Sequence, residues 1–203
     1  MAMSAPSIAV VPGGGENVNS VLFALERLGA QPELTLDPKV VAAAARVILM
    51  GVGAAPPAMA KLAAHGLVDC LRDLRQPLLG ICVGMQLLFE SSAEGDVACL
   101  GILPGRVERF PEDKGLTVPH MGWNRLDLLQ AGDPLLEGLK SGDWAFYANS
   151  YYAPPSAATI ARSDYGVPLS AAVHRGNVFG CQFHPERSAA VGARLLQNFL
   201  GFP

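Results

Sequence analysis

Charged residues are sparse in this sequence of 203 residues. Only 16% are Asp, Glu, Lys or Arg, the formal net charge is −3, and Lys and Arg form no run. Because nucleic acids and anionic membranes are bound by clustered basic side chains, we expect neither as a partner. Half of the residues are hydrophobic, which is typical of a compact globular protein. The length favours one domain, residues 1–203.

Long apolar segments are also lacking. The longest, Val40–Val52, contains Arg46 and is shorter than the roughly 20 residues that a membrane-spanning helix needs. The first residues, M-A-M-S-A-P-S, have neither the basic start nor the apolar core of a signal peptide. We therefore expect a cytoplasmic protein.

Cysteine is scarce and irregularly spaced. The four cysteines form no C-x-x-C pair, so neither a disulfide framework nor a zinc knuckle is indicated: Cys70, Cys82, Cys99 and Cys181. Cys181 and His184 form a C-x-x-H, but on a strand these positions face opposite sides of the sheet and could not share a metal ion. The glycines at 13–15 lack the third glycine of a dinucleotide-binding fingerprint. We expect no metal and no cofactor.

The first half of the chain alternates short apolar strands with amphipathic helices. Strands are predicted at 7–11, 33–36, 46–50 and before residue 82, helices at 18–28 and 57–74, and a turn or short helix at 37–38. The second half is richer in β-type segments, at 101–105, 106–110, 144–150, 159–162, 169–174 and 177–183, with a hairpin turn at 175–176 and a closing helix at 189–200. We predict an α/β fold: a single domain with an open, mostly parallel central sheet flanked by helices, and a smaller β-rich part in the second half.

The stretch P-L-L-G-I-C-V-G-M-Q-L-L-F-E, residues 77–90, is the most informative part of the sequence. An apolar run, a cysteine between two glycines, and Met85, Leu88 and Phe89 at helical spacing predict a strand, a sharp turn and a helix. On such a turn the Cys82 thiol stands clear of the sheet, the N–H groups of the helix favour its thiolate, and the amide of Val83 can hold an oxyanion. The alternative interpretation is a buried cysteine in a glycine-rich turn.

A cysteine nucleophile needs a base, and the sequence offers four histidines: His65, His120, His174 and His184. We predict His65 on a helix surface or C-terminus, and His174 exposed at a turn. His184 follows the last apolar strand, and Glu186 lies two residues further, on the same face if the strand continues. A carboxylate there can hold the imidazole in the required tautomer. The alternative is a satisfied histidine at a strand end.

G-I-C-V-G-M-Q (residues 80–86) together with Q-F-H-P-E (182–186) resembles the class I glutamine amidotransferases. This resemblance implies that Cys82 is the nucleophile, His184 the general base and acid, and Glu186 its orienter. It also implies glutamine as the small-molecule substrate.

Three more stretches resemble one family within that class, the glutaminase subunits of imidazole glycerol phosphate synthases: V-P-H-M-G-W-N (118–124), L-G-I-L-P-G-R-V-E-R-F (100–110) and M-G-V-G (50–53). This resemblance implies that ammonia passes to a (β/α)₈-barrel cyclase subunit in a heterodimer of histidine biosynthesis. It assigns the oxyanion hole to Val52, Gly53 and Val83. It assigns substrate contacts to Gln86, Asn149, Ser150 and Tyr151. It assigns the partner interface to Asn17, Trp123 and Asn124, and we expect Trp123 to lie in a turn-like stretch.

The chain departs from that family at Met50, Thr117 and Asn149, where Pro, Lys and His are usual, and in its first loop. Three other functions are alternatives. The P-H-M-G-W-N block argues against the related glutaminase of pyridoxal phosphate synthesis, and the intact triad argues against a catalytically silent binding module. A cysteine peptidase or γ-glutamyl hydrolase would turn over peptide substrates without any partner.

Overall fold

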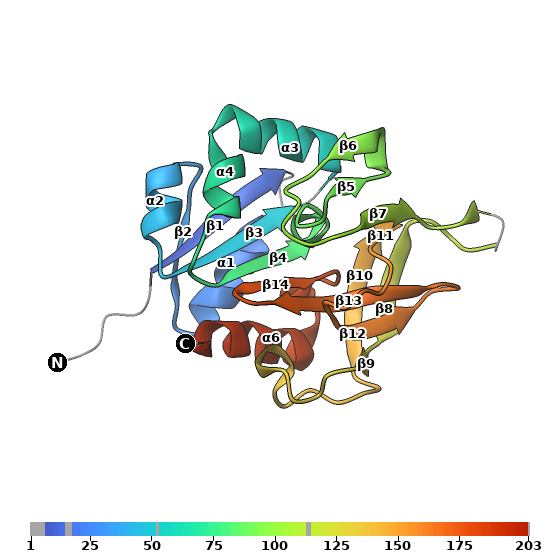
Figure 1. Ribbon diagram of the computed structural model, residues 1–203. Coiled ribbons are helices and arrows are strands. Elements are labelled where there is room, and N and C mark those ends of the chain that lie inside the picture. Colours follow the sequence, from blue (N-terminus) through green and yellow to red (C-terminus); the bar gives the residue numbers. More distant parts are fainter. Residues whose placement is uncertain (1–6, 15–17, 52, 113–114, 203) are drawn as a thin grey trace.

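A computed structural model describes residues 7–14, 18–51, 53–112 and 115–202 (Figure 1). Its first half alternates strands and helices in this order: β1 (Ser7–Gly14), α1 (Val18–Arg27), β2 (Gln31–Leu34), α2 (Pro38–Ala43), β3 (Arg46–Gly51), α3 (Ala55–Ala64), α4 (Leu67–Arg72), β4 (Leu78–Cys82) and α5 (Val83–Gln86). The apolar spacing of α1 buries Val18, Val21 and Leu25. Asp37 caps α2 by accepting from the Lys39 amide at 2.8 Å.

The second half consists mainly of strands and short 3₁₀ turns: β5 (Ser91–Ser92), η1 (Glu94–Asp96), β6 (Val97–Ala98), β7 (Arg106–Arg109), β8 (His120–Arg125), β9 (Asp127–Leu128), η3 (Pro134–Leu136), β10 (Trp144–Asn149), β11 (Tyr151–Tyr152), β12 (Thr159–Asp164), β13 (Pro168–Arg175), β14 (Val178–Cys181), η4 (Pro185–Arg187) and α6 (Ala189–Gly201). The predicted α/β class is confirmed, as is the β-rich second half.

The central sheet has the strand order β2-β1-β3-β4-β14-β13-β12-β9. The strands from β2 to β14 are parallel, and the remaining three continue the sheet in antiparallel pairs. The described residues also form two smaller sheets, β10-β8 and β11-β7-β5-β6. Because β4 and β14 are neighbours with Ile81 opposite Cys181, the segments that follow them emerge side by side.

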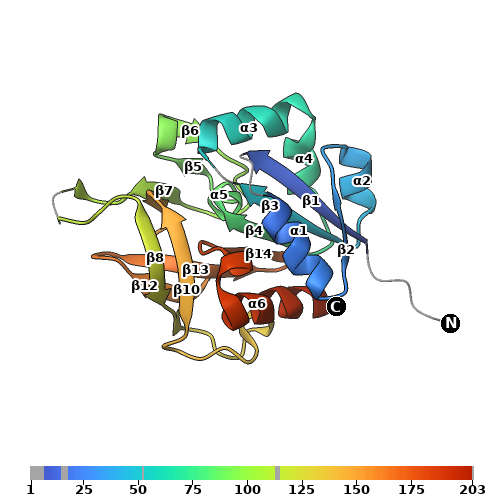
Figure 2. The ribbon, with the colours of Figure 1, turned by 180° about the vertical axis from the view of Figure 1, so that it is seen from behind.

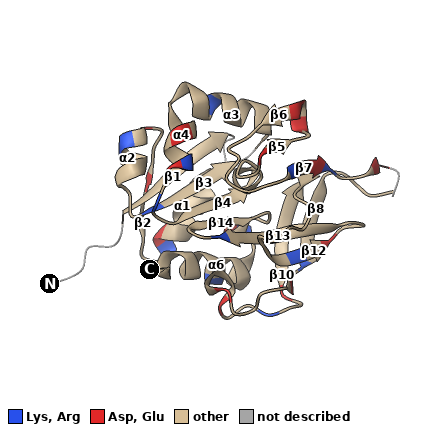
Figure 3. Cartoon of the chain, in the orientation of Figure 1, with Lys and Arg blue, Asp and Glu red and all other residues tan. Residues whose placement is uncertain are grey.

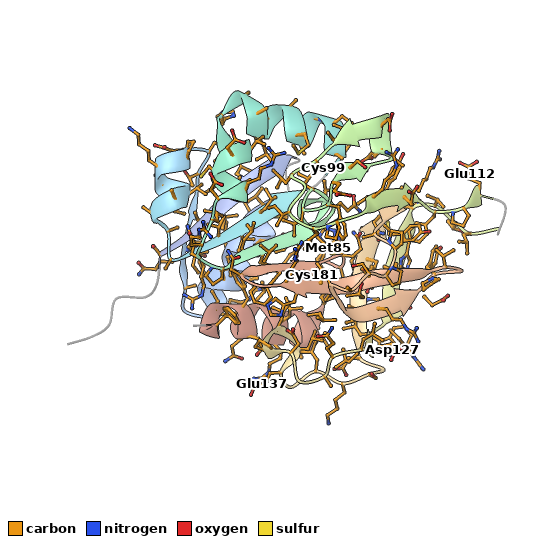
Figure 4. The ribbon with its side chains drawn as sticks, viewed as in Figure 1. Met85, Cys99, Glu112, Asp127, Glu137 and Cys181 are labelled. Atoms are coloured by element: carbon orange, nitrogen blue, oxygen red, sulfur yellow. The ribbon has the colours of Figure 1, made fainter. Side chains whose placement is uncertain are left out.

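Helices cover both faces of the parallel strands. Figures 1 and 2 show α1 and α6 on one face, and α2, α3 and α4 on the other. Buried apolar side chains fill both layers, and every residue of β4 and β14 is buried. Met85 and Cys181 lie in this interior, whereas Glu112, Asp127 and Glu137 lie at the periphery (Figure 4). Basic and acidic residues are interspersed over the outer elements (Figure 3).

Several predicted elements differ from the structure. The helix predicted at 57–74 is two helices, because Gly66 adopts a left-handed conformation (φ 65°) between α3 and α4. Residues 101–105 form no strand. Their amides instead bond to the carbonyls of Leu88 and Phe89, and this loop ends the helical stretch that was predicted to run on from Met85. The turn between β13 and β14 lies at Gly176 and Asn177, one residue later than predicted.

Strand β8 was missed by the sequence analysis. The stretch around Trp123 is not turn-like but a regular strand, paired antiparallel with β10 from Asn149–His120 to Trp144–Arg125. Its side chains alternate between an exposed face, with Met121, Trp123 and Arg125, and a more buried face.

Candidate functional site

Cys82 stands at the junction of β4 and α5. Its backbone has φ 53° and ψ −114°, a conformation that is rare outside glycine and characteristic of strained functional turns. A Cβ on Gly84 would lie 1.9 Å from the Leu49 carbonyl oxygen, and one on Gly80 would lie 2.7 Å from the Met85 backbone. The two glycines therefore let the turn pack against β3 and α5, and the predicted strand–turn–helix is confirmed.

His184 and Glu186 follow β14, the strand beside β4. The Nδ1 atom of His184 lies 2.8 Å from Oε1 of Glu186, and the two side chains are 7% and 0% exposed. The strand does not continue through this pair, because β14 ends at Cys181 and η4 begins at Pro185. The 3₁₀ turn still brings the two side chains together. Ser188 supports it by donating from Oγ to the His184 carbonyl at 2.7 Å.

The electrostatic surroundings of His184 favour its protonated form. Burial lowers its pKa, but hydrogen bonds with Cys82 and Glu186 and the negative charges of both groups outweigh burial and raise the pKa from 6.5 to about 10. A protonated imidazole in this position can donate a proton to a leaving group and stabilise negative charge beside it.

A pocket of 110 Å³ opens at Cys82. It is lined by Gly53, Cys82, Val83, Gln86, Glu94, Pro119, Ala148, Asn149, Ser150 and Tyr151. The structure therefore brings together the predicted nucleophile, two of the three predicted oxyanion residues and all four predicted substrate contacts. Val52 lies outside the described residues. A larger hollow of 650 Å³ between β8, β9 and β12 lies away from Cys82 and contains the exposed Asp127–Arg162 ion pair.

Glu94 is a pocket residue that the sequence analysis missed. Its Oε2 accepts from the Ala55 amide at 2.7 Å, which ties the loop of η1 to the start of α3. A lone glutamate in E-G-D, twelve residues after the cysteine and outside any periodic element, carries no recognisable signal. Only the folding of the loop over α3 places it at the pocket.

Asn149 contributes a polar atom without a partner. Its Nδ2 donates to the Tyr151 carbonyl at 2.8 Å. Its Oδ1 is buried and has no hydrogen-bond partner among the described residues. Because a buried acceptor without a donor is costly, this oxygen is a candidate for binding an N–H group in the pocket.

The predicted interface residues are partly accessible. Trp123 is 50% exposed on the outer face of β8. Asn124 lies on the opposite face, where its Nδ2 donates to the Asp164 carbonyl at 2.9 Å. Asn17 lies outside the described residues.

The remaining histidines have other surroundings. His65 is exposed at the C-terminus of α3, as predicted. His174 was predicted to be exposed, which is wrong: its side chain is 18% exposed, bonds to Asp133 at 2.6 Å and stacks on Phe179. His120 is buried between the rings of Tyr147 and Tyr165, and burial lowers its pKa to about 4.

Two further properties concern membranes and metals. Within the residues that the structure describes, no helix has the length and apolar character to cross a bilayer. The same residues contain no group of three His, Cys, Asp or Glu side chains that could hold a metal ion.

Comparison with known proteins identifies relatives along nearly the whole chain. The family model "Glutamine amidotransferase class-I" matches residues 16–201. The chain is 52% identical to "Imidazole glycerol phosphate synthase subunit HisH" of Xylella fastidiosa (strain Temecula1 / ATCC 700964), over 95% of the chain and 96% of that protein. It is 51% identical to the protein of the same name from Xanthomonas axonopodis pv. citri (strain 306), with the same coverage.

Solved structures show the same fold at lower identity. A structure described as a GMP synthase subunit from Thermoplasma acidophilum superposes with a TM-score of 0.76 at 20% identity, over 98% of this chain and 94% of that one. A structure described as a glutamine amidotransferase gives 0.72 at 22% identity, over 95% and 96%.

Proposed function

Since this chain belongs to the class I glutamine amidotransferases, and within them to the HisH family of imidazole glycerol phosphate synthase subunits, we propose that it is the glutaminase subunit of that enzyme. It hydrolyses glutamine to glutamate and ammonia and passes the ammonia to a cyclase subunit in histidine biosynthesis. The observation that carries the proposal is the buried His184–Glu186 pair at 2.8 Å, beside a strained cysteine turn that opens into a small polar pocket.

The first half of the reaction forms a thioester. The Cys82 thiolate attacks the side-chain amide carbon of glutamine, and the developing oxyanion is held by the amide of Val83 and an amide of the Val52–Gly53 loop. The His184 imidazolium then donates its proton to the departing nitrogen, so that ammonia leaves and a thioester remains. Glu186 stabilises the imidazolium and fixes its tautomer.

The second half reverses the proton transfer. Neutral His184 takes a proton from water, and the resulting hydroxide attacks the thioester carbon, so that the Cys82 thiolate leaves and the imidazolium forms again. The new carboxylic acid gives its proton to solvent and leaves as glutamate. The pKa of about 10 keeps His184 protonated at neutral pH before glutamine binds, which suits its role as the acid for ammonia departure.

We assign substrate recognition to the polar residues that line the pocket together with Cys82. A free glutamine carries an α-ammonium group, and the Glu94 carboxylate and the unpartnered Asn149 Oδ1 are the acceptors available to it. Gln86, Ser150 and Tyr151 complete the polar wall. The pocket thus fits a small zwitterionic amide better than a peptide, which favours a glutaminase over a cysteine peptidase.

The cyclase docks, in this proposal, on the outer face of the β8–β10 ribbon. Met121 and Trp123 are 68% and 50% exposed there, and Trp144 is 47% exposed with the Arg125 guanidinium 5.0 Å above its ring. Half-exposed aromatic side chains beside an arginine are typical of interface anchors. Residue 148, opposite Met121 on β10, lines the pocket, so this face leads to the site where ammonia forms. The partner is a (β/α)₈-barrel cyclase, and Asn17 joins the interface from the first loop.

The proposal is tested by measuring glutamate production from glutamine by the isolated chain, then with cyclase, and then with cyclase and its nucleotide substrate. We expect low activity alone and stimulation by the loaded partner, because in this proposal docking of the partner aligns the oxyanion donor in the loop that contains Gly53. Removal of one oxyanion donor costs roughly 100- to 1000-fold in turnover. Full activity of the isolated chain would contradict this gating, and hydrolysis of peptides instead of glutamine would contradict the function itself.

The triad is tested by substitution in the complex. Cys82→Ala abolishes glutamate production, and a chloroketone analogue of glutamine labels Cys82 alone. His184→Ala costs several orders of magnitude in turnover, since ammonia then lacks its proton donor, and Glu186→Gln costs less. Cys70→Ser is the matched control and retains activity. An adduct mainly on Cys99 would refute the assignment of the nucleophile.

A further inference from the structure

Gln182 is a fully buried polar residue that the proposed mechanism does not use. It immediately follows β14, is 0% exposed and does not line the pocket at Cys82. Its side chain nevertheless reaches the nucleophile, because Nε2 of Gln182 lies 3.8 Å from the Cys82 sulfur. A buried amide is costly unless both of its ends are paired, so its two partners define its role.

A chain of hydrogen bonds connects this amide to the substrate wall. Nε2 of Gln86 donates to the Tyr151 carbonyl oxygen at 2.8 Å and to Oε1 of Gln182 at 3.0 Å. The two hydrogens of the Gln86 amide are thereby both used, one on each acceptor. The four groups form a continuous relay from the Tyr151 carbonyl, through Gln86 and Gln182, to the sulfur of Cys82.

The direction of this relay follows from its first member. A backbone carbonyl only accepts hydrogen bonds, so Gln86 must present its NH₂ group to Tyr151. That NH₂ group also faces Gln182, which must therefore present its carbonyl oxygen. The NH₂ group of Gln182 is then left to face the sulfur of Cys82, and the sulfur is the acceptor.

We propose that Gln182 is a positioning residue for Cys82, whose amide N–H, oriented from the Tyr151 carbonyl through Gln86, donates to the sulfur and holds it as an acceptor. Cys82 lines the pocket and Gln182 does not, so the sulfur can accept from Gln182 while it remains accessible from the pocket. Because the sulfur accepts from Gln182, it directs no thiol proton toward that residue. The role in catalysis rests on the proposed glutaminase function, but the effect on the sulfur does not.

The relay also joins two parts of the pocket that are distant in the sequence. Tyr151 lies in the wall assigned to substrate contact, and its carbonyl accepts from both Gln86 and Asn149. The Tyr151 carbonyl therefore connects the wall assigned to substrate contact with the amide that donates to the sulfur.

The test is the pH dependence of alkylation of Cys82 by iodoacetamide, in which the thiolate displaces iodide, followed by mass spectrometry of the Cys82 peptide. The reagent discriminates among the cysteines because burial raises the pKa of Cys99 to about 11, that of Cys181 well above its usual value, and that of Cys70. Gln182→Met keeps an unbranched side chain of similar length and removes both polar ends. We expect the midpoint of the alkylation profile to move up by about one pH unit, and the rate below the midpoint to fall about tenfold.

Two companion variants separate positioning from packing. Gln86→Met leaves Gln182 in place but removes the donor that orients it. We therefore expect the midpoint of the alkylation profile to move in the same direction as in Gln182→Met, and by no more than it does there. The double variant should behave like Gln182→Met alone, because Gln86 acts on the sulfur only through Gln182. Phe179→Leu, a core change in the strand that Gln182 follows, has no part in the relay; it should lower stability and leave the alkylation profile unchanged.

A folded Gln182→Met protein with the wild-type alkylation profile would overturn the proposal. If that variant does not fold, an unshifted profile in Gln86→Met overturns it instead, and an equal shift in Phe179→Leu does so by showing that any loss of packing has the same effect. Failure of the glutaminase function is a separate outcome: it would show as absent glutamate production with cyclase, whatever the alkylation profile.

Discussion

Replacement of His120 by phenylalanine should make the stability of the protein less sensitive to acid. The His120 residue is 4% exposed, and its ring centroid lies 3.9 Å from that of Tyr165 and 4.9 Å from that of Tyr147, with the ring nearly parallel to both. Its Nδ1 atom has no hydrogen-bond partner among the described residues. Phenylalanine keeps a flat ring in this stack and removes the group that titrates.

The magnitude follows from the shift in the pKa of His120. Burial lowers it from 6.5 to about 4 in the folded protein, so between these values the unfolded chain binds more protons than the folded one. The free energy of unfolding of the wild type therefore falls as the pH drops through this window. With these two pKa values the loss between pH 7 and pH 5 is about 2 kcal/mol, and it is absent from His120→Phe. For a chain of this size such a difference corresponds to roughly 4–8 °C in melting temperature.

Urea denaturation of both proteins at pH 7 and pH 5 measures the effect. The difference in unfolding free energy between variant and wild type should grow by about 2 kcal/mol in favour of His120→Phe on going to pH 5. Phe110→Leu is the matched control: Phe110 contacts the same histidine edge-on but does not titrate, so this variant should lose similar stability at both pH values. Parallel pH dependence of wild type and His120→Phe would refute the reasoning, because His120 would then titrate alike in the folded and unfolded states.

Three further predictions concern the site and its supports. Glutaminase turnover of the complex should persist through pH 9 and fall as the pH rises through about 10, where His184 loses its proton; a fall beginning near pH 6.5 would contradict the raised pKa. Gly84→Ala should lower the unfolding free energy by about 1–3 kcal/mol in urea denaturation, since its Cβ would lie 1.9 Å from the Leu49 carbonyl oxygen, and an unchanged midpoint would show that the turn can shift. Ser188→Ala should lower the unfolding free energy by about 1–3 kcal/mol, because Oγ of Ser188 donates to the His184 carbonyl and accepts from the Phe146 amide at 2.9 Å. Equal melting temperatures of variant and wild type would contradict this.

Local patterns were sufficient for the parts of the fold whose interactions are close in sequence. Apolar runs predicted the parallel strands, glycines two residues on either side of Cys82 predicted its turn, and the spacing of His184 and Glu186 predicted their contact. Each of these depends on backbone sterics or on side chains within a few residues of one another. The errors also had local causes that pattern alone does not resolve, such as the left-handed Gly66 that divides one predicted helix into two.

Tertiary structure decided which distant residues share the site. Glu94 reaches the pocket through its bond to Ala55, 39 positions away, and Gln182 reaches Cys82 across 100 positions because β14 pairs with β4. The burial of His120 likewise depends on aromatic rings contributed by β10 and by the residues after β12. The sequence by itself was therefore enough to propose Cys82, His184 and Glu186 as the reacting groups. The polar contacts that orient the Cys82 side chain and line the pocket depend on long-range strand pairing, which no short motif encodes.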